Sequence, residues 1–267
     1  MLDLVKPDPQ TGDKPLMIFY DDAQNVYGRP RPVWLSLGIN VRGERSRVMR
    51  RCFRNTRQIV ELALNVLLGT QAPETVKVKT KTFADLAYLR EQQLIEETEH
   101  YCKVWFAERE GVLPQVKSFR SYGDEITWVA QELVRLITVE AVRPEDLLVL
   151  FYQPSTINLH ALKQQLQQAL PGQAFIEPYG DSADKQHYLF RPGYLTLSTV
   201  YGAKGYDAPV VFVIGADRFA DDTQGRAAFY VGATRAKLLL YVTGVTREHS
   251  LLTEADAVLK QMAVAEA

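Results

Sequence analysis

The stretch Ser198–Asp217, STVYGAKGYDAPVVFVIGAD, decides the fold of this chain. Its first half is a loop in which Lys204 lies between two glycines. Its second half contains a run of β-branched and aromatic residues, Val210 to Ile214, that is typical of a buried strand. Glycine lets a backbone approach a ligand closely, and the lysine adds a positive charge. The pattern predicts a flexible basic loop anchored on a stiff strand.

Apolar strands and amphipathic helices alternate on both sides of this stretch. Strands are expected at residues 115–121, 145–152, 194–200, 209–216 and 238–244, and helices at 123–141, 156–170, 225–237 and 251–265. Strands separated by helices imply right-handed crossovers, because that is how consecutive parallel strands are joined. The fold class is therefore α/β, a parallel sheet with helices on both faces.

Composition sets limits on function. The chain has 267 residues, 46% of them hydrophobic and 24% charged, which is ample for a sizeable core. A net charge of −1 argues against a strongly basic nucleic-acid coat but allows a local basic groove. Cys52 and Cys102 lack the spacing of a disulfide framework or a zinc site, so no metal site is expected. With no membrane span and no signal peptide, we expect a soluble, cytoplasmic protein.

The first 113 residues are less regular. Residues 16–19 follow a proline-rich loop and are expected to form a buried strand, although such a strand needs neighbours on both sides. A helix of about four turns is expected between a cap at Asn55 or Thr56 and a stop at Gly69. Residues 83–110 have helical propensity throughout and are expected to form a small helical insertion.

Polar clusters fall at the ends of predicted strands or at helix starts, where open parallel sheets bind ligands. They are Asp21, Asp22 and Gln24; Arg54; Lys204 with Asp207; and Arg235. Together they suit a polyphosphate held near a magnesium ion, because arginine offers a fixed planar fork to phosphate oxygens. Each cluster taken alone is equally compatible with a solvated turn, an ion pair or a surface helix residue.

In their order along the chain, these segments resemble the third to sixth signature motifs of superfamily I helicases of the UvrD/Rep class. IFYDDAQNVYGR resembles motif III, RRCFRNTRQIVELA motif IV, LTLSTVYGAKGYDAPVVFV motif V, and AAFYVGATRAKLLLYV motif VI. Four motifs in the right order are far more specific than any one of them. The resemblance spans Leu16 to about Gly244 and implies a RecA-like sheet, the second motor domain of such a helicase.

The resemblance assigns roles at a nucleotide site for ATP. Arg54 and Arg235 would be an arginine pair that reaches the γ-phosphate across a domain cleft, and Gln24 would sense the same phosphate. Phe53 takes the position of the aromatic residue that packs on adenine. Asp207 stands where the family has a glutamate that binds the ribose.

Further roles follow for the motif V loop and for single-stranded DNA. Lys204 and Gly205 belong to the loop that grips a ligand and reports on the nucleotide. Four residues are expected to contact DNA by stacking on bases or touching the backbone: Tyr27, Trp34, Thr199 and Tyr201.

The chain lacks a G-x-x-x-x-G-K-[ST] phosphate loop and the D-E-x-Q motif that would hold Mg²⁺. The resemblance therefore divides it into the last strand and motif III loop of a first RecA-like domain (1–30), the start of the second (31–69), a linker with the helical insertion (70–113), and the remainder of the second domain (114–267). ATP and Mg²⁺ are expected to bind only together with the missing first RecA-like domain, in cis or in trans.

Two alternatives to an ATP-dependent helicase fragment remain open. The first is a stand-alone RecA-like module that binds nucleic acid or protein without ATPase activity. The second is an unrelated α/β enzyme. Little in the sequence supports this second alternative, because the chain contains neither a G-x-S-x-G elbow nor a G-x-G-x-x-G loop.

Overall fold

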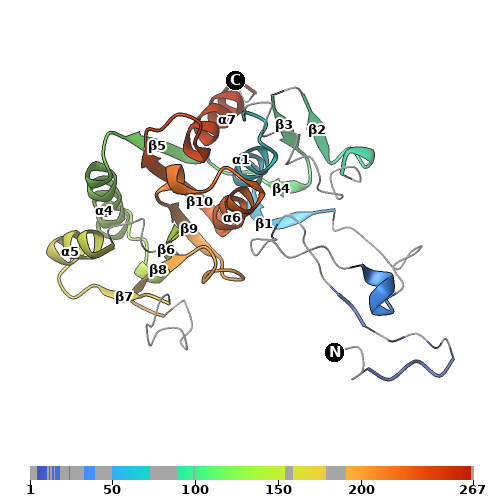
Figure 1. The fold of residues 1–267 in the computed structure, drawn as a ribbon. Helices are drawn as coiled ribbons and strands as arrows, with labels where there is room; N and C mark the ends of the chain where they lie inside the picture. Colours follow the sequence, from blue (N-terminus) through green and yellow to red (C-terminus); the bar gives the residue numbers. More distant parts are fainter. Residues whose placement is uncertain are drawn as a thin grey trace.

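The computed structural model describes residues 5–10, 12, 14, 16–18, 24, 33–39, 50–72, 89–98, 100–153, 159–178 and 191–265. A six-stranded sheet forms its centre, in the order β5-β10-β9-β6-β8-β7 (Figure 1). All neighbouring strands in it are parallel. The strands are β5 (Gln115–Phe119), β6 (Leu147–Phe151), β7 (Ala174–Ile176), β8 (Tyr194–Thr199), β9 (Ala208–Val213) and β10 (Ala236–Val245).

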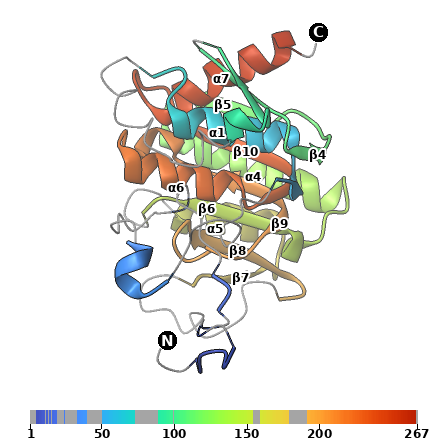
Figure 2. The same cartoon turned by 90° about the vertical axis from the view of Figure 1, so that its right-hand side faces the viewer.

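Helices cover both faces of this sheet (Figures 1 and 2). One face packs against α4 (Tyr122–Thr138) and α5 (Leu159–Ala169). The other packs against α1 (Arg57–Leu68), α6 (Thr223–Ala233) and α7 (Leu251–Ala265). Strand β6 shows why two cores form, because its successive side chains alternate between the two clusters and all of them are buried. The predicted RecA-like α/β arrangement is confirmed. Among the described residues, no helix is long and apolar enough to span a bilayer.

Helix α1 lies where the sequence predicts a helix. Thr56 is its N-cap residue, and Gly69 ends it with a positive φ of 63°, a conformation that glycine adopts without strain. Nearly every residue of α1 is buried. This is because α6 and α7 pack on one side of it and the segment around Cys102 on another.

The predicted helical insertion is wrong from residue 95 on, whereas residues 89–91 are helical. Its described part from residue 95 on forms β2 (Ile95–Glu97) and β3 (Cys102–Val104), which pair antiparallel, and β4 (Ala107–Arg109), which pairs parallel with β1 (Cys52–Thr56). The side chains of Cys102, Val104 and Ala107 are buried in the α1 core. Helical propensity is a weak preference, and burial of alternate side chains against α1 overrides it.

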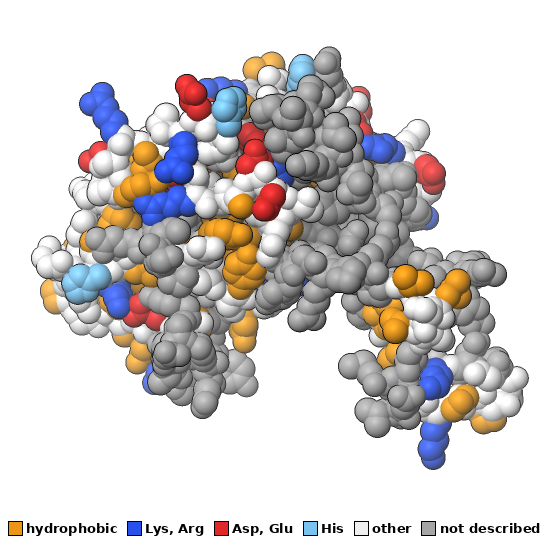
Figure 3. Space-filling model, viewed as in Figure 1, with side chains coloured by type: hydrophobic (Ala, Val, Ile, Leu, Met, Phe, Trp, Pro, Cys, Tyr) orange, Lys and Arg blue, Asp and Glu red, His pale blue; other side chains and the backbone are white. Residues whose placement is uncertain are grey.

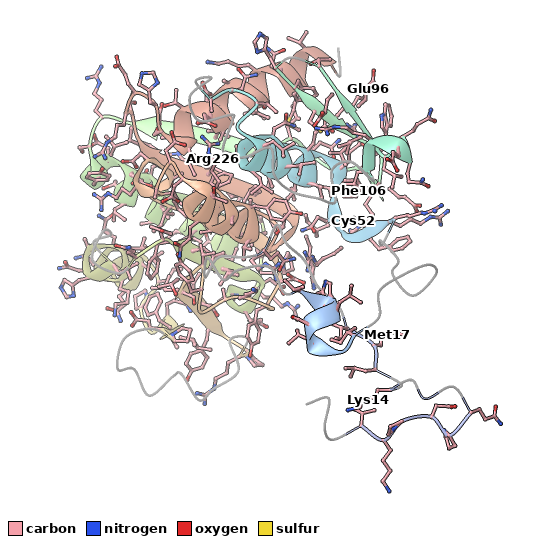
Figure 4. The ribbon with its side chains drawn as sticks, turned by 45° about the vertical axis from the view of Figure 1, so that its right-hand side comes forward. Lys14, Met17, Cys52, Glu96, Phe106 and Arg226 are labelled. Carbon is pink, nitrogen blue, oxygen red and sulfur yellow. The ribbon has the colours of Figure 1, made fainter. Side chains whose placement is uncertain are left out.

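A buried strand at residues 16–19 is also wrong for the residues that can be placed. Leu16, Met17 and Ile18 lie outside any strand, with Met17 78% and Ile18 43% exposed. Figure 4 shows Met17 and Lys14 on a segment that extends away from the helices and sheet, and Figure 3 shows apolar side chains on its surface. A buried strand needs neighbouring strands to pair with, and among the described residues no strand lies beside residues 16–18.

Candidate functional site

Asp207 and Arg235 lie side by side at the start of two neighbouring strands. Asp207 directly precedes β9 and Arg235 directly precedes β10, and the Ala208 N–H donates to the Arg235 carbonyl at 3.0 Å. Both residues are therefore at the amino ends of their strands. Ligands of open parallel sheets usually bind at the opposite, carboxyl ends of the strands. Short segments, α6 before Arg235 and the motif V loop before Asp207, return the chain to this rim of the sheet.

Arg54, on β1, lies on the other side of the Asp207 carboxylate from Arg235. Its Nη1 lies 3.7 Å from Asp207 Oδ2, and Arg235 Nη1 lies 3.0 Å from Asp207 Oδ1. The Arg235 side chain is 2% exposed, that of Asp207 19% and that of Arg54 38%, so the cluster opens to solvent on the Arg54 side. The two guanidinium groups that the sequence analysis paired do converge on one rim of the sheet.

Asn55 holds this rim together, and the sequence analysis missed it. Its buried Nδ2 donates to the carbonyls of Thr234 and Ala236, at 2.8 and 2.5 Å, one on each side of Arg235. Its Oδ1 accepts a hydrogen bond from Arg54 Nε at 3.2 Å. One amide thus binds both arginine segments. No local signal could have identified it, because two of its partners are backbone atoms far along the chain.

Arg235 is further fixed by its own helix. Its Nε donates to the Val231 carbonyl at 3.0 Å, at the C-terminal end of α6. A cation is favoured at this end of a helix, where unsatisfied carbonyls carry partial negative charge. Phe53 precedes Arg54 on β1 and is 61% exposed, so its ring is available as a flat apolar surface.

The loop between β8 and β9, residues 200–207, runs from the carboxyl ends of the strands to their amino ends. Thr199 pairs with Phe151 at the carboxyl end of β6, whereas Val210, just after Asp207, pairs with Leu147 at its amino end. At about 3.3 Å per residue, the loop's two ends are roughly 20 Å apart along the strands. Within the loop, the Lys204 Nζ donates to the Gln24 carbonyl at 3.0 Å, which brings two predicted site residues together.

Gly205, next to Lys204, has a φ of +94°, and a side chain at this position would meet no atom within 4 Å. Only glycine adopts this backbone conformation without strain, so the loop turns here for the reason that the sequence suggested. The space around Gly205 leaves the backbone open to a ligand.

The carboxyl-end side of the loop is aromatic. Thr199 Oγ1 accepts from the Gly202 N–H at 3.0 Å, and the Tyr201 ring lies 5.9 Å from that of Tyr152, which is 5.0 Å from Phe219. Burial, followed by its hydrogen bond with Tyr152, raises the pKa of Tyr201 well above its usual value. The hydroxyl is therefore neutral at physiological pH.

The remaining predicted site residues have no described contact with the arginine cluster. Trp34 begins a short 3₁₀ helix, Trp34–Leu37, and is half-buried. Asp21, Asp22 and Tyr27 lie outside the described residues. In the ranges that the structure describes, no three His, Cys, Asp or Glu side chains gather as metal ligands.

Part of the chain matches a known protein family. Residues 194–247 match the family model of the UvrD-like helicase C-terminal domain. The ATP-dependent DNA helicase HMI1, mitochondrial, of Saccharomyces cerevisiae is 37% identical over 82 residues, which are 28% of this chain and 11% of that protein. The C-terminal domain of a possible DNA helicase from Lactobacillus plantarum WCFS1 aligns over 78% of this chain and 96% of its own, with 16% identity and a TM-score of 0.48.

The match to the family model includes the 200–207 loop and Arg235, the segments that resemble motifs V and VI. The predicted resemblance to the C-terminal half of UvrD-like helicases is confirmed. The chain spans about a tenth of the curated relative's length.

Proposed function

We propose that this chain, in which residues 194–247 are a UvrD-like helicase C-terminal segment, supplies the second motor-domain half of the nucleotide site of an ATP-dependent DNA helicase. The observation that carries the proposal is the convergence of Arg54 and Arg235 on Asp207. Their segments come from opposite ends of the chain, and the buried amide of Asn55 holds them together.

The chemistry of this rim suits a γ-phosphate. Two guanidinium groups offer planar donor forks that stay charged at any physiological pH. In phosphoryl transfer, such a cation stabilises charge that develops on the transferred group, an effect worth about 10³–10⁵ in rate in systems where it has been measured. Arg54 and Arg235 would have this role in the proposed helicase.

The base and the DNA would lie on either side of that phosphate site. The exposed ring of Phe53 offers a surface on which adenine can stack beside Arg54. Thr199 and Tyr201 lie at the carboxyl ends of the strands, opposite the arginines. We place the single-stranded DNA there, with Tyr27 and Trp34 as further stacking residues. Because the 200–207 loop connects the carboxyl ends of the strands with their amino ends, it would couple DNA contacts with nucleotide contacts.

The chain supplies only part of such a site. Its 267 residues contain no phosphate-binding loop of the G-x-x-x-x-G-K-[ST] type. ATP and Mg²⁺ would therefore be held mainly by a first RecA-like domain, with Gln24 at the junction. The guanidinium groups of this chain would complete the site. We expect the chain alone not to hydrolyse ATP.

Turnover measurements test the proposal. The chain is mixed with the polypeptide that carries the phosphate-binding loop, encoded in frame or beside it, and ATP hydrolysis is followed with single-stranded DNA. Arg235→Ala should lower kcat by about 10³-fold or more with little change in nucleotide affinity. Arg143→Ala is the matched control, because the ion pairs of this exposed arginine within the described part of the chain are local ones, with Asp146 and Glu145.

Three results would count against the proposal. Turnover by the chain alone would show that it carries its own phosphate site. An Arg235→Ala variant as active as the Arg143→Ala control would remove the role of the arginine. DNA binding without turnover, in the presence of the active partner polypeptide, would instead favour a stand-alone binding module.

A further inference from the structure

Asp207 forms ion pairs with the two arginines that a phosphate would need, although its buried Oδ1 accepts no hydrogen bond among the described residues. Each of its two carboxylate oxygens faces a different arginine, Oδ1 facing Arg235 and Oδ2 facing Arg54. A carboxylate and a phosphate oxygen compete for the same guanidinium N–H groups, because both are anionic acceptors of similar geometry. A nucleotide phosphate that reaches these arginines must therefore displace Asp207 or share their donors with it.

The charges of the cluster favour displacement by a more negative group. Two guanidinium groups and one carboxylate carry a net charge of +1, so one carboxylate leaves part of the positive charge uncompensated. An anion with one charge gains little over Asp207, which is already in place and loses no freedom on binding. A group with two or more adjacent negative charges interacts with both arginines more strongly than the carboxylate does.

The geometry also sets an order of release. The contact of Asp207 with Arg54 is the longer one, 3.7 Å, and it lies on the exposed side of the cluster. The contact with Arg235 is 3.0 Å and lies behind it, with the guanidinium 2% exposed. An incoming anion meets Arg54 first and exchanges there with Oδ2, after which Asp207 can leave Arg235.

We propose that Asp207 is a specificity-determining residue of this site: it holds Arg54 and Arg235 until a polyphosphate displaces it, and so excludes singly charged anions. This inference rests on the proposed function, since it concerns the same arginine pair. It differs from the ribose contact that the resemblance implies for Asp207. A ribose contact adds affinity for nucleotides, whereas a competing carboxylate lowers affinity for every anion.

Binding of inorganic tripolyphosphate, which has no ribose, separates the two roles. Calorimetry on the full chain would compare tripolyphosphate, acetate and ATP for wild type, Asp207→Asn and the control Asp256→Asn. Asp256 is an exposed acid on α7, paired with Lys260 within that helix. We expect Asp207→Asn to bind tripolyphosphate about tenfold more tightly and to gain measurable affinity for acetate, a singly charged anion. Asp256→Asn should bind like wild type.

The outcomes separate this inference from the proposed function. If wild type and Asp207→Asn bind tripolyphosphate with equal affinity, the inference is overturned. If Arg54→Ala at the same time loses this binding, the arginine site still stands. Weaker ATP binding with unchanged tripolyphosphate binding would assign Asp207 to the ribose and also overturn it. No tripolyphosphate binding by any folded variant would overturn the inference, whereas the proposed function is tested separately by the turnover of Arg235→Ala with the partner polypeptide.

A measurement on the unaltered chain covers the case in which Asp207→Asn does not fold. The side-chain Nε–H resonances of Arg54 and Arg235, identified with lysine variants, are followed by NMR during a tripolyphosphate titration. Displacement of Asp207 requires both resonances to shift together, and to shift with tripolyphosphate but not with the same concentration of acetate. A shift of Arg54 alone would contradict displacement.

Discussion

Two buried arginines lie nine positions apart, at the two ends of the α6 segment, and they are used differently. Arg226, 0% exposed, donates to both carboxylate oxygens of Glu254 at 2.6 and 2.7 Å, to Asp221 at 2.5 Å and to the Val66 carbonyl at 2.6 Å. It is one cation between two carboxylates. Arg235, 2% exposed, instead shares the carboxylate of Asp207 with a second arginine.

Burial alone therefore does not separate a structural arginine from one placed for a ligand, but the local balance of charge does. The Arg226 cluster has more negative than positive groups and lies inside the packing of α1, α6 and α7. The rim cluster has an excess positive charge and opens to solvent at Arg54. Helix α1 links the two clusters. Arg226 donates to the carbonyl of Val66 near the C-terminal end of α1, and β1, which carries Arg54, leads directly into the N-terminal end of α1 (Figure 4).

Replacement of Arg226 should have the largest effect on stability. Arg226→Ala leaves the buried carboxylate of Glu254 without its cation, and breaking a buried pair in this way costs about 3–5 kcal/mol. Arg235→Ala should cost less than half of that, because Asp207 is partly exposed and retains Arg54. Urea unfolding followed by circular dichroism measures both. Equal losses would break the distinction between the two arginines.

The sequence predicts the central sheet well. Buried parallel strands are near-continuous apolar runs and their helices keep one apolar face, so both patterns are local and strong. The closing helix was expected at residues 251–265 and α7 is Leu251–Ala265. Thr56 and Gly69, the cap and stop of α1, were also read from local chemistry.

What the sequence could not predict depends on distant contacts. Residues 95–109 favour a helix locally and become strands because α1 provides their apolar partner. Asn65 on α1 also bonds the N–H and the carbonyl of Cys102, at 2.7 Å each, as a neighbouring strand would. The arginine pair was predicted through a resemblance. Asn55 fixes that pair by donating to the carbonyls of Thr234 and Ala236, two distant backbone atoms that no local pattern reveals.

Asn55 tests whether the rim cluster depends on one amide. Asn55→Ala leaves two buried carbonyls without this donor, so unfolding should become about 1–3 kcal/mol easier. Asn65→Ala is a matched control, because Asn65 is equally buried and also donates to two carbonyls, but it holds the β3 segment. Both variants should lose stability, and only Asn55→Ala should lose tripolyphosphate affinity. Equal affinity losses would mean that Asn55 acts on the fold as a whole.

Glu125 adds a third type of buried charge and the smallest predicted effect. Its carboxylate is 0% exposed and accepts from the Gly215 N–H at 2.8 Å and the Thr243 hydroxyl at 2.6 Å. Burial, more than the nearby charge of Asp217, raises the pKa of Glu125 in the folded chain. The folded state therefore binds a proton more tightly than the unfolded state, and stability falls as pH rises from the unfolded pKa, about 4.3, through the raised folded pKa.

Glu125→Gln keeps an acceptor oxygen without the charge, so it should remove this part of the pH dependence. At pH 7 the variant should be about 1 kcal/mol more stable than wild type, and the two should converge below pH 4. Glu96→Gln, at an exposed position of β2, controls for the loss of one acid. Thermal unfolding between pH 4 and 8 measures the difference. A Glu125→Gln variant less stable than wild type at pH 7 would mean that the carboxylate is compensated, as the acids around Arg226 are.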